Sequence, residues 1–120
     1  MRDHFKLKAF KLADEIALSI CQITKKFPKE EIYGLTSQIR RAAVSVPPNI
    51  VEGCARESQA EYLRFLEIAF GSLRELDYQY SLAQRLGYTK GTGSAEFEAK
   101  LYEAQKVLGG LILIHALRKN

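Results

Sequence analysis

The chain has 120 residues, of which 47% are apolar and 27% charged, as expected for a single globular domain spanning residues 1–120. No segment approaches the ~18 uncharged apolar residues of a membrane-spanning helix, and Asp14 and Glu15 interrupt the only candidate for a secretory signal. We therefore expect a cytoplasmic protein that does not enter a membrane. The formal charge of +4 is compatible with an anionic partner but is also common in proteins that bind none.

The first predicted helix is marked by apolar residues that recur in steps of four and three. This spacing places them on one face of an amphipathic α-helix. The stripe consists of Ala9, Ala13, Ile16, Ile20, Ile23 and Phe27. Pro28 then ends the helix, because proline lacks a backbone N–H and its ring clashes with the preceding turn.

The second predicted helix begins at Tyr33-Gly34 and contains two adjacent prolines, Pro47 and Pro48. Its apolar stripe runs through Leu35, Ile39, Ala43, Val46, Ile50 and Cys54. The prolines remove two backbone donors and disfavour helical geometry at the residue before them. Because the stripe keeps its phase across the prolines, we expect one kinked helix rather than two helices.

The third predicted helix starts at a capping box, in which Ser58 is followed by Glu61. Its stripe is the most regular in the chain and consists of Tyr62, Leu66, Ala69, Leu73, Leu76, Tyr80 and Ala83. Gly87 closes the helix as a C-terminal glycine cap.

The fourth predicted helix follows a glycine-rich turn over residues 89–93 and is capped by Ser94. Its stripe consists of Phe97, Leu101, Ala104, Leu108 and Leu111 and reaches His115. Since the linkers are short, consecutive helices are expected to be antiparallel neighbours. The sequence therefore predicts an all-α fold, an antiparallel up-down-up-down four-helix bundle with a kinked second helix.

Helices three and four carry more apolar residues than one bundle core requires. Outside the stripes lie Leu63, Phe65, Ile68 and Phe70 on the third helix, and Val107, Ile112, Leu113, Ile114 and Leu117 on the fourth. A helix that is apolar nearly all round must be covered on more than one side. We expect a subunit interface, with Phe65, Ile68, Ile112 and Ile114 as its contacts; the alternative is a wide core stripe with a few exposed leucines.

The residues needed for catalysis or metal binding are sparse. The two histidines, His4 and His115, are not part of the Glu-x-x-His pairs that a di-iron bundle requires. The two cysteines, Cys21 and Cys54, are expected at levels of the bundle roughly 20 Å apart, beyond the reach of a disulfide. We predict no metal, no cofactor and no enzymatic activity.

A second group of residues is polar and flanks the predicted core where helices two and three meet. Ser45, Asn49, Glu52, Arg56 and Glu75 are its candidate members. Glu52 and Arg56 are four residues apart and can pair along one helix, whereas Ser45 and Asn49 flank the prolines and can bond to the carbonyl groups that the prolines leave free. We interpret this group as a structural polar network that fixes the kink and the pairing of the two helices.

Three segments of the chain resemble a known family. They are Tyr33-Gly-Leu-Thr-Ser-Gln-Ile-Arg-Arg-Ala42, Ser45-Val-Pro-Pro-Asn-Ile-Val-Glu-Gly53 and Glu61-Tyr-Leu-Arg-Phe-Leu-Glu-Ile-Ala-Phe-Gly-Ser-Leu-Arg-Glu75. The family is that of four-helix-bundle proteins encoded in intervening sequences of bacterial 23S ribosomal RNA genes. The resemblance implies a homopentameric ring, and a similarity to the accessory protein of diversity-generating retroelements, which binds nucleic acid and a reverse transcriptase.

This resemblance implies structured RNA or DNA, a nucleic-acid enzyme and further copies of the chain itself as partners. The candidate nucleic-acid-binding residues are Lys25, Lys26, Lys29, Arg40 and Arg41, which together would form a basic rim near the turn between helices one and two. Two functions follow as alternatives: an RNA-binding adaptor, or a protein-interaction scaffold on which the same charges only face solvent.

Overall fold

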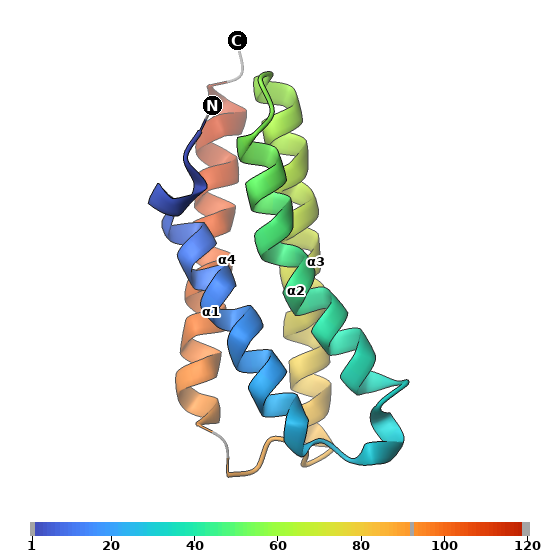
Figure 1. Cartoon of the computed structure of the whole chain (residues 1–120). Helices are drawn as coiled ribbons and strands as arrows, with labels where there is room; N and C mark the ends of the chain where they lie inside the picture. The colour runs from blue at the N-terminus through green and yellow to red at the C-terminus, as the bar shows by residue number, and fades with distance from the viewer. Residues whose placement is uncertain (1, 92, 119–120) are drawn as a thin grey trace.

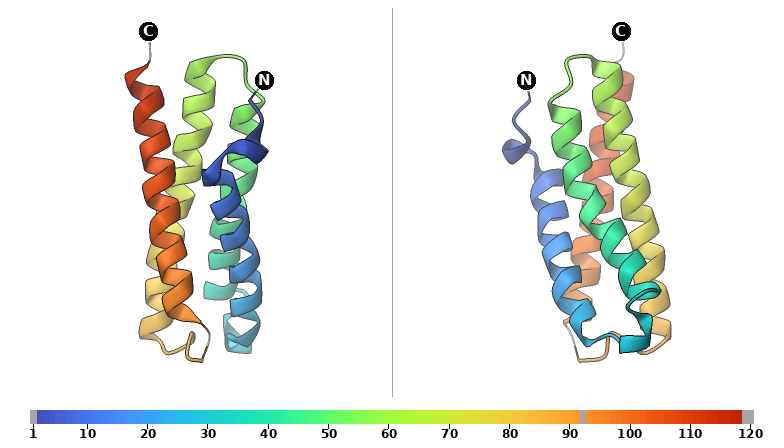
Figure 2. Two further views of the ribbon diagram at one scale, coloured as in Figure 1. Left: turned by 90° about the vertical axis from the view of Figure 1, so that its left-hand side faces the viewer. Right: turned by 45° about the vertical axis from the view of Figure 1, so that its right-hand side comes forward.

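A computed structural model describes residues 2–91 and 93–118 (Figure 1). Its elements are η1 (His4–Lys6), α1 (Lys8–Ile23), η2 (Thr24–Lys26), η3 (Lys29–Glu31), α2 (Leu35–Cys54), α3 (Gln59–Arg85) and α4 (Ser94–Leu117). Figures 1 and 2 show the four α-helices side by side with alternating directions. The predicted all-α, antiparallel four-helix bundle is therefore confirmed, and the described part of the chain contains no strand.

Each helix packs against the helices next to it in the sequence, and α4 closes the bundle by packing against α1. The result is an elongated body of 48 × 25 × 21 Å. The predicted stripes face its interior, where Ile16, Ile20, Ile39, Ile50, Leu66 and Leu76 have no exposed surface. The spacing of apolar residues thus identifies the core correctly.

The first helix ends one turn earlier than expected. α1 stops at Ile23, and a 3₁₀ turn over Thr24–Lys26 precedes Pro28. Within this turn the hydroxyl of Thr24 donates to the carbonyl of Ile20 at 2.6 Å, a side-chain bond of the kind that competes with helical geometry. Phe27 is still buried, although it lies outside the helix.

The second helix runs without a break from Leu35 to Cys54 and contains both prolines, and Figure 1 shows it changing direction along its length. Asn49 Nδ2 donates to the carbonyl of Ser45 at 2.8 Å, and Ser45 Oγ donates to the carbonyl of Ala42 at 2.9 Å. These two carbonyls lie on either side of the carbonyls of residues 43 and 44. In a regular helix those would accept from the backbone N–H groups of residues 47 and 48, but both are prolines and have none. The side chains therefore brace the kink from both sides rather than replacing the lost bonds.

The ends of the last two helices agree with expectation at Ser58 and Gly87 and differ at Ser94. Ser58 Oγ accepts from the backbone N–H of Glu61 at 3.1 Å, as predicted for the start of α3. Gly87 has a φ of 81°, the conformation that a glycine cap requires. Ser94, however, is the first residue of α4 rather than its cap, because Gly93 precedes it in a non-helical conformation. Residue 92 of the predicted turn lies outside the described residues.

α2 approaches α3 closely at Gly53. A β-carbon at this position would stand 2.9 Å from Cβ of Phe65 and 3.3 Å from the carbonyl oxygen of Tyr62. Only glycine leaves room for the helices to meet at this distance. By contrast, a β-carbon at Gly71 on α3 would have no neighbour within 4 Å.

These two glycines give a matched pair of substitutions. We expect Gly53→Ala to lower the free energy of unfolding by about 1–3 kcal/mol, since the added methyl group must push two packed helices apart. Gly71→Ala should raise it by about 0.5–1 kcal/mol, because alanine is the better helix former and meets no obstacle. Urea denaturation of both variants measures the difference, and equal midpoints would contradict the close approach at Gly53.

Candidate nucleic-acid interface

The first and third connections between helices, α1–α2 and α3–α4, lie at the same end of the molecule (Figure 1). The carboxylate of Glu31 joins them: Oε1 accepts from the backbone N–H of Leu35 at 3.1 Å, and Oε2 accepts from the hydroxyl of Tyr88 at 2.9 Å. The ring of Phe27 packs 5.4 Å from that of Tyr88. The bond to Glu31 raises the pKa of Tyr88, which therefore stays neutral and continues to donate.

Three of the predicted binding residues lie exposed at this end. Lys25 and Lys26 belong to η2, and Lys29 begins η3. Among residues 2–91 and 93–118, the ion pairs shorter than 4.0 Å do not involve any of these lysines. Their charges are therefore available to a ligand.

Sequence reasoning missed an exposed lysine at the same end. Lys90 lies in the α3–α4 connection, and a β-carbon added at Gly87 would stand 3.7 Å from its side chain. The signal was present in the sequence, because an up-down-up-down bundle places its first and third connections together. Lys90 thus extends the basic surface, defined here as Lys25, Lys26, Lys29 and Lys90.

Arg40 has a different environment from these lysines. Its side chain is half-buried, and Nε donates to Oγ1 of the buried Thr24 at 2.6 Å. This bond ties α2 to the end of α1. Since the acceptor is a neutral hydroxyl, the positive charge of Arg40 remains uncompensated and adds to the potential at this end.

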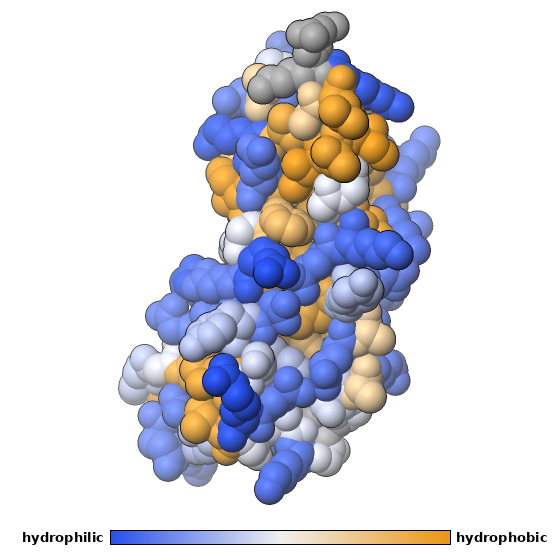
Figure 3. All heavy atoms as spheres, turned by 180° about the vertical axis from the view of Figure 1, so that it is seen from behind, coloured by the Kyte–Doolittle hydropathy of each residue, from blue (hydrophilic) through white to orange (hydrophobic). Residues whose placement is uncertain are grey.

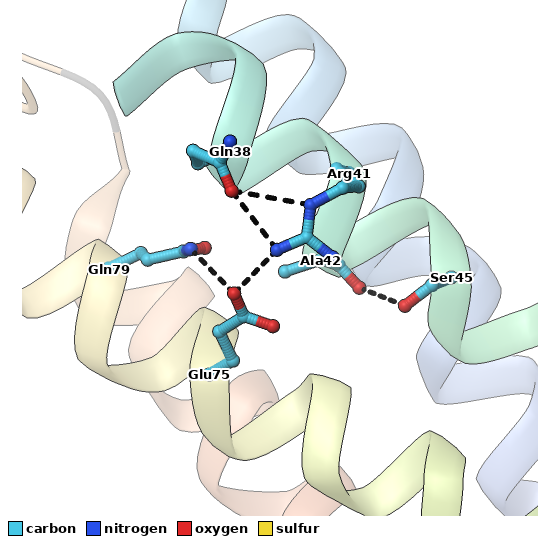
Figure 4. A network of polar contacts seen from close by, with 6 residues as sticks. All are labelled: Gln38, Arg41, Ala42, Ser45, Glu75 and Gln79. Carbon is cyan, nitrogen blue, oxygen red and sulfur yellow. Dashed lines mark hydrogen bonds and ion pairs between the residues drawn. The ribbon is translucent and has the colours of Figure 1, made fainter. Parts of the chain in front are cut away.

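Arg41 faces α3 instead and has an acidic partner (Figure 4). Its Nη2 lies 2.6 Å from Oε2 of Glu75, and its guanidinium also donates to Oε1 of Gln38. Gln79 donates to the same Glu75 oxygen at 3.2 Å. The structure therefore separates Arg41 from the other candidates, because its charge is balanced by a carboxylate and serves the pairing of α2 with α3.

The candidates for the structural polar network divide into three sets. Ser45 and Asn49 bond to the backbone of their own helix, and Glu75 bonds across to α2 through Arg41. Glu52 on α2 pairs with Arg56, which lies two residues beyond the end of that helix, with 2.6 Å between Oε1 and Nη2. As both partners are substantially exposed, this pair contributes at most about 1 kcal/mol.

The four predicted interface residues do not share one surface. Phe65 is half-buried against α2, beneath the guanidinium of Arg56 at 4.9 Å from the ring centre. Ile112 packs against the core, while Ile68 is 41% and Ile114 49% exposed. Ile114 lines the side of the bundle between α4 and α1, whereas Phe65 lies on the opposite side, between α3 and α2.

The exposed apolar surface is most extensive on α4. Leu113, Ile114 and Leu117 are all exposed, and Figure 3 shows apolar side chains gathered over the end of the bundle where α4 finishes. A groove of about 590 Å³ runs between α1 and α4. Its lining includes Leu7, Tyr102, Val107, Gly110, Leu111 and Ile114, with the Lys8–Glu103 ion pair of 2.8 Å at its edge.

His115 lies at the opposite end from the lysines and joins three segments of the chain. Gln59 Nε2 lies 2.9 Å from Nδ1 of His115, and Gln59 Oε1 accepts from Arg2 at 3.0 Å. The guanidinium of Arg2 stacks 3.8 Å above the ring of Tyr62, whose edge contacts the imidazole. Since the amide of Gln59 donates, Nδ1 must accept, which assigns the neutral tautomer with its proton on Nε2.

Residues 2–91 and 93–118 contain neither a group of side chains that could hold a metal ion nor a helix that could cross a membrane. Within these ranges no three histidine, cysteine or acidic side chains are grouped so that they could hold a metal ion. The same ranges contain no helix with the length and apolar character needed to cross a membrane. Cys21 and Cys54 are both free, as predicted, although only Cys54 is buried.

The fold and its basic end define a class of small four-helix proteins for which no enzymatic activity is indicated. The model of the 23S rRNA-intervening sequence protein family matches residues 5–110. The chain therefore belongs to this family, as the sequence motifs predicted.

Comparison with solved structures supports the same assignment. The chain resembles a protein of unknown function from the S23 ribosomal protein family of Bacteroides thetaiotaomicron, with a TM-score of 0.77 and 25% sequence identity. The similarity covers 87% of this chain and 94% of the other. No curated protein matches the sequence.

The environment of His115 predicts a pH-dependent stability. Burial, followed by the charges of Arg118 and Arg2, lowers the pKa of His115 below its usual 6.5. The unfolded chain then binds more protons than the folded one as the pH falls below about 6.5, so stability is complete above that pH and declines below it. Urea denaturation between pH 7.5 and pH 5.5 should show this loss.

The variant His115→Asn provides the control. The asparagine amide oxygen can accept from Gln59 in place of Nδ1, but it cannot be protonated in this range. We expect the variant to lose less stability than the wild type over the same interval. An unchanged dependence on pH would show that His115 is not the group responsible.

Proposed function

We propose that this chain is a cytoplasmic, non-enzymatic, homo-oligomeric RNA-binding adaptor. The observation that supports this proposal is the basic surface formed by Lys25, Lys26, Lys29 and Lys90, together with the uncompensated charge of Arg40. The segment from Thr24 to Leu35 holds three lysines and two acidic residues, Glu30 and Glu31, and Glu31 is already engaged by Leu35 and Tyr88.

Phosphate groups need only reachable cations on a common surface, and they do not require a shaped pocket. The lysines meet this condition, since they are exposed and free of ion pairs among the described residues. Four or five charges on one copy bind RNA weakly at physiological salt. Assembly into a ring would repeat them around its axis and strengthen binding through multivalency.

The family description connects its members with intervening sequences of 23S rRNA. For this reason structured ribosomal RNA is the first ligand to test. A nucleic-acid enzyme is the protein partner that we propose, by analogy with the retroelement accessory protein that the sequence resembles.

A second function, a protein-interaction scaffold, is favoured by the groove between α1 and α4. Its apolar lining and the neighbouring Leu113 and Leu117 are exposed, and such surfaces commonly mark protein interfaces. On this alternative the lysines only keep the protein in solution. The two functions differ in whether RNA binds and in which surface is required.

Titration with structured ribosomal RNA at several salt concentrations distinguishes these functions. The logarithm of the affinity should fall linearly with the logarithm of the salt concentration if lysines neutralise phosphates. We expect the variant Lys25→Glu/Lys26→Glu to bind at least about tenfold more weakly and to have a salt slope smaller by about one or more.

The matched control is Lys6→Glu/Lys11→Glu, which has the same net charge but alters exposed lysines of η1 and α1, away from the basic surface. This control should bind RNA nearly as well as the wild type. Equal weakening by both variants would indicate only a general charge effect, and absence of binding at low salt would exclude the RNA-binding function.

The proposed assembly can be tested by sedimentation equilibrium at micromolar concentration. We expect a species of five times the 13.6 kDa mass of one chain, and a charged substitution in the exposed apolar surface of α4, Ile114→Glu, should dissociate it. A folded wild-type monomer at this concentration would contradict the proposed oligomer while leaving the RNA titration to decide the function of the basic surface.

A further inference from the structure

Tyr33 is the most exposed of the large apolar and aromatic side chains, with 94% of its surface accessible. It lies at the basic end, between η3 and α2. Phe27, the other aromatic residue in this stretch of sequence, is buried beside Tyr88 and cannot contact a ligand. Tyr33 is thus the aromatic ring of the η2–η3 region that faces solvent.

The backbone around Tyr33 is held in place on both sides. The N–H of Ile32 donates to the carbonyl of Lys29 at 3.1 Å, and that of Gly34 donates to the carbonyl of Glu31 at 2.9 Å. A β-carbon at Gly34 would stand 2.9 Å from Oε1 of Glu31, so a larger residue would displace the carboxylate oxygen that accepts from Leu35. The ring therefore projects from an ordered turn, and a ligand need not order the backbone when it binds.

The surroundings of Tyr33 indicate what kind of ligand covers it. Lys29, four residues before Tyr33, begins η3, and Lys25 and Lys26 are exposed in the adjoining η2 turn. A protein hot spot is ordinarily surrounded by further apolar contacts, whereas Ile32 is the one exposed apolar neighbour of Tyr33 in the sequence from Thr24 to Leu35. Glu30 and Glu31 lie between Lys29 and Tyr33, but the carboxylate of Glu31 is engaged by Leu35 and Tyr88. An aromatic ring beside three exposed lysines matches a polyanion that carries flat, unsaturated rings.

We infer that the basic surface binds unpaired RNA and that Tyr33 is a stacking platform for one of its bases. This inference rests on the proposed function and makes it more specific. In a duplex both faces of each base are covered by its neighbours, so that only unpaired nucleotides can stack on a protein side chain. The lysines contact the phosphates on either side, and a single platform of this kind confers little sequence preference.

Fluorescence anisotropy with a short unpaired RNA, and with a duplex of the same length, tests the inference. We expect Tyr33→Ala to weaken binding of the unpaired RNA by roughly 5- to 100-fold and to leave duplex binding unchanged. Tyr33→Phe should retain nearly full affinity, because it keeps the ring. Phe5→Ala is the matched control, since Phe5 is an aromatic residue that is 66% exposed but lies in η1, at the opposite end of the bundle from the basic surface.

The outcomes separate the inference from the proposed function. If Lys25→Glu/Lys26→Glu weakens RNA binding but Tyr33→Ala does not, the stacking role is wrong and the RNA-binding function stands. Equal losses in Tyr33→Ala and Phe5→Ala would also overturn the stacking role. If the wild type binds neither RNA at low salt, the proposed function itself fails, and Tyr33 with Ile32 would belong to a protein contact.

Discussion

The packing of α2 on α3 is the constraint on which the rest of the structure depends. The helices make their most extensive contact with each other, and Gly53 allows this by bringing the α2 backbone close to Tyr62 and Phe65. Farther along, the Arg41–Glu75 pair crosses the same seam. Because α2 is held in this way, its first turn and the preceding η3 turn are also fixed, and so are the lysines beside them. The candidate interface thus depends on contacts made along the whole length of the hairpin.

Much of the fold could be predicted because each helix carries a complete signal of its own. The steps of four and three mark the buried faces, and Ser58 and Gly87 mark two of the helix ends. The errors concern places where a side chain competes with the backbone or where a turn has its own geometry. Thr24 bonds to Ile20 at the end of α1, and Gly93 replaces Ser94 as the residue before α4. Periodicity contains no information about either.

The candidate site was less predictable, as Arg40 and Arg41 illustrate. The two are adjacent in the sequence, yet Arg40 bonds to the neutral hydroxyl of Thr24, which leaves its charge unbalanced. Arg41 instead pairs with the carboxylate of Glu75, which is 34 residues away. Periodicity gives the angle of a side chain about its own helix but does not say which neighbouring helix lies there. The same limit applies to Phe65 and Ile114, which are apolar and lie outside the core stripes but face different neighbours.

The adjacent prolines of α2 have a consequence for how the molecule reaches its folded state. Pro47 and Pro48 deprive the middle of the helix of two ladder bonds. The parts of α2 on either side of them are no longer than the ~12–15 residues below which an isolated helix is marginal in water. The segment is therefore expected to remain largely unstructured until α3 supplies a surface for it to fold upon. The smallest portion of the chain able to order itself during synthesis is then the α2–α3 hairpin, and not either helix alone.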